Sequence, residues 1–176
     1  LTEANGDLEQ ALDVLRKQGI EVARKRDGKS ASEGTVASYV HAGDQIGVLV
    51  EVNCETDFVA RTERFKEFAQ DAAMQVAALQ PKWVAPEDVP EEALDRERNV
   101  LREQAQKEGK PEHIVEKMVE GRLSKFYEEF CLLKQPYIRD DSVTIEDKLN
   151  ELVTAVGERV VIRRFVRFQV GEEDAY

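Results

Sequence analysis

Two histidines and two cysteines are the residues of this sequence with the widest chemical repertoire. His41 and His113 lack the second histidine or cysteine at short spacing that zinc motifs use. Cys54 and Cys131 stand inside apolar stretches with no base beside them, which favours small core residues over a nucleophile or a disulfide pair. The sequence therefore predicts no metal, no cofactor and no catalytic thiol.

A phosphate-binding loop is the next chemistry to consider, because Lys29 and Ser30 follow Gly28. Such a loop needs a glycine five positions before Gly28, and Ala23 stands there without an apolar strand leading in. Carboxylates are numerous, but no motif places a pair of them across a reacting bond. We therefore predict that the chain binds no nucleotide of its own, and these residues by themselves leave its activity open.

Segment 56–59 (Thr56, Asp57, Phe58 and Val59) places an aromatic ring beside a carboxylate in a short loop. In one interpretation Phe58 is buried against a sheet or helix, while Asp57 is solvated or caps a turn. In the other, Phe58 is an exposed wedge for an apolar groove on a partner protein, with Asp57 beside it. The pattern alone leaves both interpretations open.

Composition limits the partners that this segment could serve. The 176 residues carry 36 acidic and 25 basic side chains, a formal charge of −11 that disfavours nucleic acid as a ligand. No apolar run approaches the roughly 18 residues of a membrane-spanning helix, and no signal-peptide pattern is present. We therefore predict a soluble protein in a reducing compartment, bound to neither membrane nor nucleic acid.

The N-terminal part of the chain predicts a helix over residues 7–19. Leu8, Ala11, Leu12 and Leu15 recur at helical spacing. Asp7 is suited to cap its start, and Gly19 to end it in a left-handed conformation. Residues 21–33 are polar and basic, which is typical of an exposed linker.

The elements that hold segment 56–59 follow from the next stretch. Two alternating runs, 35–41 and 46–54, are separated by a turn-rich gap and predict an antiparallel hairpin with one buried face. Helical spacing resumes over 62–79. The segment should therefore connect the second strand to this helix.

The C-terminal half predicts a helical pair, a further helix and a last strand. A charged helix over 91–108 and a more apolar one that runs from Pro111 to Phe130 should form an antiparallel, protruding pair. Residues 145–156 form a helix with Thr144 as its cap, which Gly157 ends. The alternation over 159–170 predicts a strand that joins the hairpin, with one face formed by Val160, Ile162, Val166, Phe168 and Val170.

These elements predict an α+β fold: an antiparallel sheet of three or more strands packed with helices, with a protruding helical hairpin. We divide the chain into an N-terminal helical part (1–20), a linker (21–33), a core domain (34–171) that includes the hairpin 91–131, and an acidic tail (172–176).

Several separated motifs in this sequence resemble the bacterial-type translation elongation factor Ts family. The strongest is Gly47-Val48-Leu49 followed by Val50-Glu51-Val52-Asn53-Cys54-Glu55-Thr56-Asp57-Phe58-Val59-Ala60. Matches continue in the same order with Gly109-Lys110-Pro111, Glu116-Lys117-Met118-Val119-Glu120-Gly121-Arg122, Gln135-Pro136-Tyr137 and Arg163-Arg164-Phe165-Val166-Arg167-Phe168. The resemblance spans essentially the whole chain.

The resemblance implies a guanine nucleotide exchange factor for elongation factor Tu, which is not an enzyme because it makes and breaks no bonds itself. In the family, the residues that match Asp57 and Phe58 push between two helices of the partner's nucleotide domain near its magnesium site, which weakens GDP binding. It also implies that residues 1–20 are the last part of a three-helix, ubiquitin-associated-like domain whose earlier helices are absent from this sequence. Thr56, Asp57, Phe58 and Val59 are thus the candidate partner-binding residues.

The same resemblance implies a short family form that works as a homodimer, and we expect the strand around Val160–Val170 to contribute to a two-fold interface. The expected location is the cytoplasm, with the plastid stroma as the alternative. Two other functions stay open from the sequence: a hydrolase or transferase that uses scattered carboxylates, and a structural or ribosome-associated protein that kept this fold without exchange activity.

Overall fold

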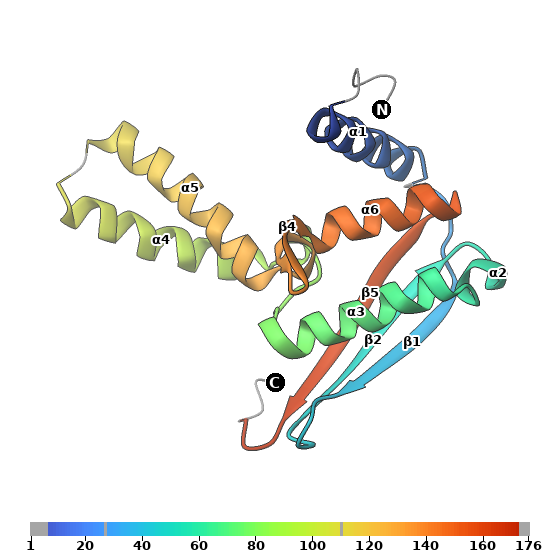
Figure 1. The fold of residues 1–176 in the computed structure, drawn as a ribbon. Coiled ribbons are helices and arrows are strands. Elements are labelled where there is room, and N and C mark those ends of the chain that lie inside the picture. Colours follow the sequence, from blue (N-terminus) through green and yellow to red (C-terminus); the bar gives the residue numbers. More distant parts are fainter. Residues whose placement is uncertain (1–6, 27, 110, 173–176) are drawn as a thin grey trace.

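The computed structural model describes residues 7–26, 28–109 and 111–172 (Figure 1). The fold is α+β, as predicted. Its elements are, in chain order, α1 (Leu8–Arg26), β1 (Glu33–Val40), β2 (Ile46–Cys54), α2 (Asp57–Ala60), α3 (Glu63–Leu79), α4 (Glu91–Lys107), α5 (Glu112–Phe130), β3 (Pro136–Tyr137), β4 (Asp140–Thr144), α6 (Ile145–Val156) and β5 (Val160–Gln169). Short 3-10 turns lie at Pro86–Asp88 and Leu132–Lys134.

The main sheet has the order β1-β2-β5, and both neighbouring pairs are antiparallel. This confirms the predicted hairpin and the addition of the last strand to it. The central strand β2 turns Val48, Val50 and Val52 into the core, where they are buried. Its alternate residues face the other side of the sheet, where Leu49 is exposed and Glu51 and Asn53 are half-buried.

A β-bulge changes the face on which the residues of β5 lie. Val52 pairs with Ile162 whereas the adjacent Glu51 pairs with Arg164, so Arg163 has no partner on β2 in the described sheet. The extra residue reverses the alternation. The prediction of one common face is therefore wrong: Val160 and Ile162 are buried in the core, whereas Phe168, beyond the bulge, is exposed on the opposite face.

Helix α3 covers one face of the sheet (Figure 1) and supplies most of the helical side of the core. Thr62 caps its start, with its side chain accepting a hydrogen bond from the backbone N–H of Phe65. The side chain of Phe65 is fully buried, and the small Ala69, Ala72 and Ala73 let the helix lie close to the strands. The predicted apolar face of this helix is confirmed.

Helix α1 does not end at Gly19, as the sequence predicted, but continues to Arg26. Gly19 is buried where α1 packs against α6: a Cβ built there would lie 3.3 Å from Thr154 Oγ1. This glycine thus permits a close helix contact instead of ending a helix. Of the described residues in the predicted linker, only 28–32 lie outside helix and strand. The predicted face of Leu8, Leu12 and Leu15 lies outside the described side chains.

Helices α4 and α5 form the predicted protruding arm (Figure 1). The arm has its own apolar cluster, in which Leu94, Leu101 and Ala105 of α4 meet Val115 and Val119 of α5. The short β3–β4 hairpin beside its base was not predicted. Helix α6 begins and ends as predicted: Thr144 and Asp147 form a capping box, and Gly157 adopts a left-handed φ of 71°.

Substitution of Gly34 tests the close approach of β1 to β2. This glycine has a φ of 146°, and a Cβ at its position would lie 2.1 Å from the carbonyl oxygen of Val52. We expect Gly34→Ala to lower the free energy of unfolding by about 2 kcal/mol or more, because the clash is with backbone. Urea denaturation followed by circular dichroism measures the loss.

The matched control is Gly47→Ala, which is also in the hairpin but has no described atom within 4 Å of the added methyl group. It should change the free energy of unfolding by less than about 1 kcal/mol. Equal losses in the two variants would contradict the steric account of Gly34.

Candidate partner-binding site

Segment 56–59 is not the irregular loop that the sequence predicted, because Asp57–Ala60 form a single helical turn, α2. Thr56 is its N-cap: the side-chain oxygen accepts a hydrogen bond from Val59 N at 3.4 Å, and the carbonyl oxygen accepts one from Ala60 N at 3.3 Å. The cap residue has an extended backbone, which turns the chain from β2 into the helix. The turn projects beyond the end of the sheet (Figure 1).

The four candidate residues divide into two that face solvent and two that anchor the turn. Phe58 is 78% exposed, so the interpretation that buries it in the core is wrong. Val59 is partly buried against the core cluster, and Thr56 is also partly buried. An aromatic ring is therefore presented to solvent by a turn whose other side packs onto the core.

Asp57 lies beside the ring and forms an ion pair with Arg61 one turn later, with 2.7 Å between Oδ2 and the guanidinium. The carboxylate side chain is 45% exposed and that of Arg61 is 77% exposed. A pair so open to water contributes about 1 kcal/mol or less. The carboxylate can therefore exchange this partner for another group at little cost.

Two glutamates far apart in the sequence tie the turn to the body of the protein. Glu158, between α6 and β5, accepts hydrogen bonds from Thr56 N at 3.0 Å and from Thr56 Oγ1 at 2.7 Å. Glu55 in turn accepts a hydrogen bond from Arg159 N at 2.7 Å, and it lies 3.6 Å from the guanidinium of Arg26 at the end of α1. Sequence reasoning missed these residues, because no local pattern relates positions about 100 residues apart.

The buried side chain of Cys54 also contacts this turn. Its thiol donates a hydrogen bond to the carbonyl oxygen of Thr56 at 3.1 Å. Burial, and to a lesser degree the charge of Glu158, raises the pKa of Cys54 to about 11. Burial likewise raises the pKa of Cys131 to about 11. Both cysteines are free and buried, as predicted, and their thiols are protonated at neutral pH.

Among the other titratable groups that the structure describes, His41 and Tyr137 make structural contacts. His41 Nδ1 lies 3.0 Å from the hydroxyl of Tyr39, and the side chain of His113 is outside the described part of the chain. Burial raises the pKa of Tyr137 to about 12, and its hydroxyl donates to Asp71 at 2.6 Å. Within residues 7–26, 28–109 and 111–172, no cluster of histidine, cysteine and carboxylate side chains is suited to hold a metal ion.

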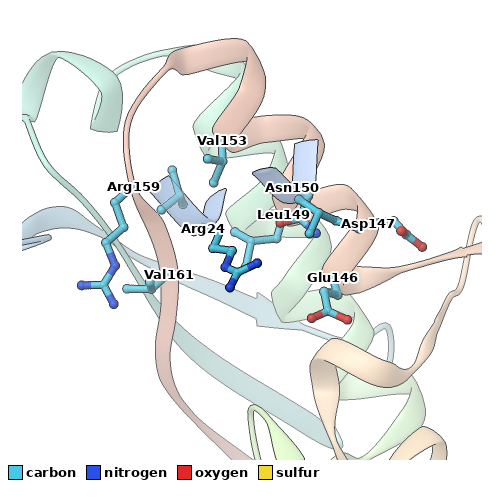
Figure 2. Close-up of a pocket in the computed structure, with 10 residues that line it drawn as sticks. Arg24, Glu146, Asp147, Leu149, Asn150, Val153, Arg159 and Val161 are labelled. Carbon is cyan, nitrogen blue, oxygen red and sulfur yellow. The ribbon is translucent and has the colours of Figure 1, made fainter. Parts of the chain in front are cut away.

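A shallow pocket of about 430 Å³ lies between α1, α6 and the start of β5 (Figure 2). Arg24 and Arg159 line it together with Asn150, Glu146 and Asp147. Its charges are mixed, and Asp147 is engaged in the cap of α6. The pocket follows from the packing of α1 on the core and does not include segment 56–59.

No helix in the described ranges has the length and apolarity needed to cross a bilayer.

An exposed ring and a carboxylate on an anchored helical turn can do little covalent chemistry, but they suit insertion into another protein. The turn is therefore a candidate surface for binding another protein.

Comparison with known proteins identifies its family. The sequence profile described as "Elongation factor TS" matches residues 9–172. Elongation factor Ts of Moorella thermoacetica is 59% identical over 98% of this chain and 85% of its own length. The proteins of the same name from Carboxydothermus hydrogenoformans and Caldanaerobacter subterraneus are 56% and 55% identical over 98% of this chain, which is 79% and 86% of their own lengths.

The chain therefore belongs to the elongation factor Ts family, which confirms the resemblance found in its motifs. Proteins of this family are nucleotide exchange factors and do not catalyse bond chemistry themselves.

The exposure of Phe58 predicts that its removal hardly affects folding. We expect Phe58→Ala to change the free energy of unfolding by less than about 1 kcal/mol, because little buried contact is lost. Phe65→Ala is the matched control: this ring is fully buried, and its loss should cost about 3–5 kcal/mol. Urea denaturation of both variants measures the difference, and a loss of several kcal/mol in Phe58→Ala would contradict an exposed ring.

Proposed function

We propose that this chain promotes GDP release from elongation factor Tu during translation elongation, as a guanine nucleotide exchange factor. Membership of the elongation factor Ts family supports this activity. The observation that carries the mechanism is the exposure of Phe58, beside Asp57, on an anchored turn. In this proposal both side chains insert near the magnesium site in the partner's nucleotide domain.

The thermodynamic basis is the coupling of two binding events on the partner. If the exchange factor binds nucleotide-free elongation factor Tu more tightly than the GDP-bound form, GDP must bind the complex more weakly by the same factor. Neither Asp57 nor Phe58 needs to touch the nucleotide. They need only make contacts that form in the nucleotide-free state and are strained in the other.

The two side chains contribute in different ways. Most of the Phe58 ring is in water in the free chain, so full enclosure by a partner would contribute about 1.5–3 kcal/mol. Asp57 would bring a negative charge close to a bound magnesium ion and its ligands, where charge strongly affects coordination. Its weak surface pair with Arg61 offers little resistance to that rearrangement.

The charge of the chain is consistent with a protein ligand. A formal charge of −11 does not favour direct contact with nucleic acid, and the proposed ligand, elongation factor Tu, is a protein. This role would place the chain in the cytoplasm, where translation elongation takes place in bacteria.

The release of fluorescent GDP from elongation factor Tu tests this function. We expect the chain to accelerate release, and expect Asp57→Ala and Phe58→Ala each to reduce that acceleration about tenfold or more. Val100→Ala is the control, because Val100 is also an exposed apolar residue but lies on α4. It should leave the rate unchanged.

Two results would count against the proposal. If the folded chain does not accelerate GDP release, it is not an exchange factor in this form, and the structural alternative is favoured. If it does so but both variants match it, exchange depends on another surface.

We further propose that two copies of the chain associate through the uncovered face of the sheet. Large apolar side chains are exposed there on each strand of the sheet β1-β2-β5: Val36, Val40, Leu49 and Phe168, with Val170 just after β5. Helices α3 and α6 pack with the core residues on the opposite face. A patch of this kind is typical of an interaction surface, and a two-fold axis lets one patch cover its copy.

Placing a charge within this patch tests the dimer. We expect the parent chain to be a dimer by light scattering at micromolar concentration, and Phe168→Glu to be a monomer with unchanged circular dichroism, because two-fold symmetry buries the new charges together. Val100→Glu on the arm should remain a dimer. A monomeric parent chain would contradict this interface.

A further inference from the structure

Two glutamates anchor segment 56–59. One precedes the segment and the other lies between α6 and β5, and each accepts hydrogen bonds from the part of the chain that carries the other. Glu55 comes just before the segment and accepts from the backbone of Arg159. Glu158 comes just before Arg159 and accepts from the backbone and side chain of Thr56. Two neighbouring residues on one chain segment thus exchange contacts with two neighbouring residues on the other, so the segments are held at two points instead of one.

The hydrogen bonds to Thr56 leave its hydroxyl with one orientation. Oγ1 donates its hydrogen to Glu158 at 2.7 Å and at the same time accepts a hydrogen bond from Val59 N. The bond that starts α2 and the bond that ties α2 to Glu158 therefore share one atom. Hydrogen bonds to an ionised group are short and stronger than neutral ones, so Glu158 also favours the capping geometry of the turn.

We propose that Glu158 is a positioning residue for exchange: it holds α2 so that Phe58 and Asp57 project at a fixed angle before the partner arrives. A helical turn whose backbone is already ordered loses less conformational entropy on binding. Because the ring itself has few contacts within the chain, its orientation depends on the backbone of α2. Glu158 fixes that backbone through Thr56 without touching the partner.

This inference rests on the proposed exchange function for its consequence, but the anchoring of α2 can be measured without any partner. Two variants separate the contributions of Glu158. Glu158→Ala removes both acceptor oxygens, whereas Glu158→Gln keeps one acceptor oxygen and the size of the side chain. Glu151→Ala is the control: it removes a glutamate of α6 whose ion pair, with Lys148, lies on the surface.

The first measurement is amide hydrogen exchange over residues 56–61, with residues 63–79 of α3 as the internal reference. We expect Glu158→Ala to speed exchange over 56–61 by about tenfold or more, because two anchoring bonds are lost. Glu158→Gln should have an intermediate effect and Glu151→Ala none. Exchange over 63–79 should be unchanged in all three variants.

The second measurement is GDP release from elongation factor Tu over a range of chain concentrations. For Glu158→Ala we expect the maximal release rate to fall about tenfold, with a smaller change in the concentration for half-maximal effect, because the rest of the interface is intact. Recovery of part of this rate by Glu158→Gln would distinguish positioning from a general loss of structure. If Glu158→Ala does not fold, the same two measurements on Glu158→Gln decide.

The outcomes separate the two proposals. Unchanged hydrogen exchange over 56–61 in Glu158→Ala overturns the anchoring role, whatever the GDP-release measurement shows. Faster hydrogen exchange with an unchanged maximal release rate overturns the positioning role. If the parent chain does not accelerate GDP release at all, the exchange function fails, and with it the consequence of positioning, while hydrogen exchange still reports whether Glu158 anchors α2.

Discussion

The sheet of this protein has two faces, and the helices cover one of them. Burial of Val48, Val50 and Val52 beneath α3 accounts for the strand register, because a slip by one residue would turn these side chains to the other side. The bulge at Arg163 shifts the alternation of β5 by one residue, so that Ile162 lies in the core whereas Phe168, six residues later, lies on the outer face. One-sided packing thus produces both the core and the apolar outer face.

The residues that stabilise the site are distinct from those that would act on a partner. Phe58 is exposed and contributes little to folding, so the favourable free energy of burying its ring is still available for binding. Glu158 and Glu55 make charge-assisted contacts but lie behind the turn. This separation means that the angle of the ring and the affinity of the ring for a groove can vary independently.

Local signals were predictable from the sequence, and contacts between distant residues were not. The cap at Thr144 and the left-handed Gly157 depend on a few neighbouring residues, so the pattern located α6 correctly. The prediction that Gly19 ends its helix is wrong, because the close contact with Thr154 that requires a glycine arises only where α1 packs against α6. The family motif drew attention to Asp57 and Phe58, but nothing near them in sequence pointed to Glu158.

Helix α3 also relates the site to the arm, because it begins directly after α2 and ends at the base of the arm. Its 17 residues span about 25 Å, and α2 and the arm lie at opposite ends of the molecule (Figure 1). Near its far end, the buried amide of Gln75 donates to Gln135 at 3.3 Å and to the carbonyl of Pro136 at 3.0 Å. Gln135 in turn donates to the carbonyl oxygens of Leu79 at 3.2 Å and of Glu129, near the end of α5, at 2.8 Å. Because unpaired buried amides are costly, this network ties the base of the arm to α3. The distance between the base of the arm and α2 is therefore set by the length of α3 and by the buried amide network near its end.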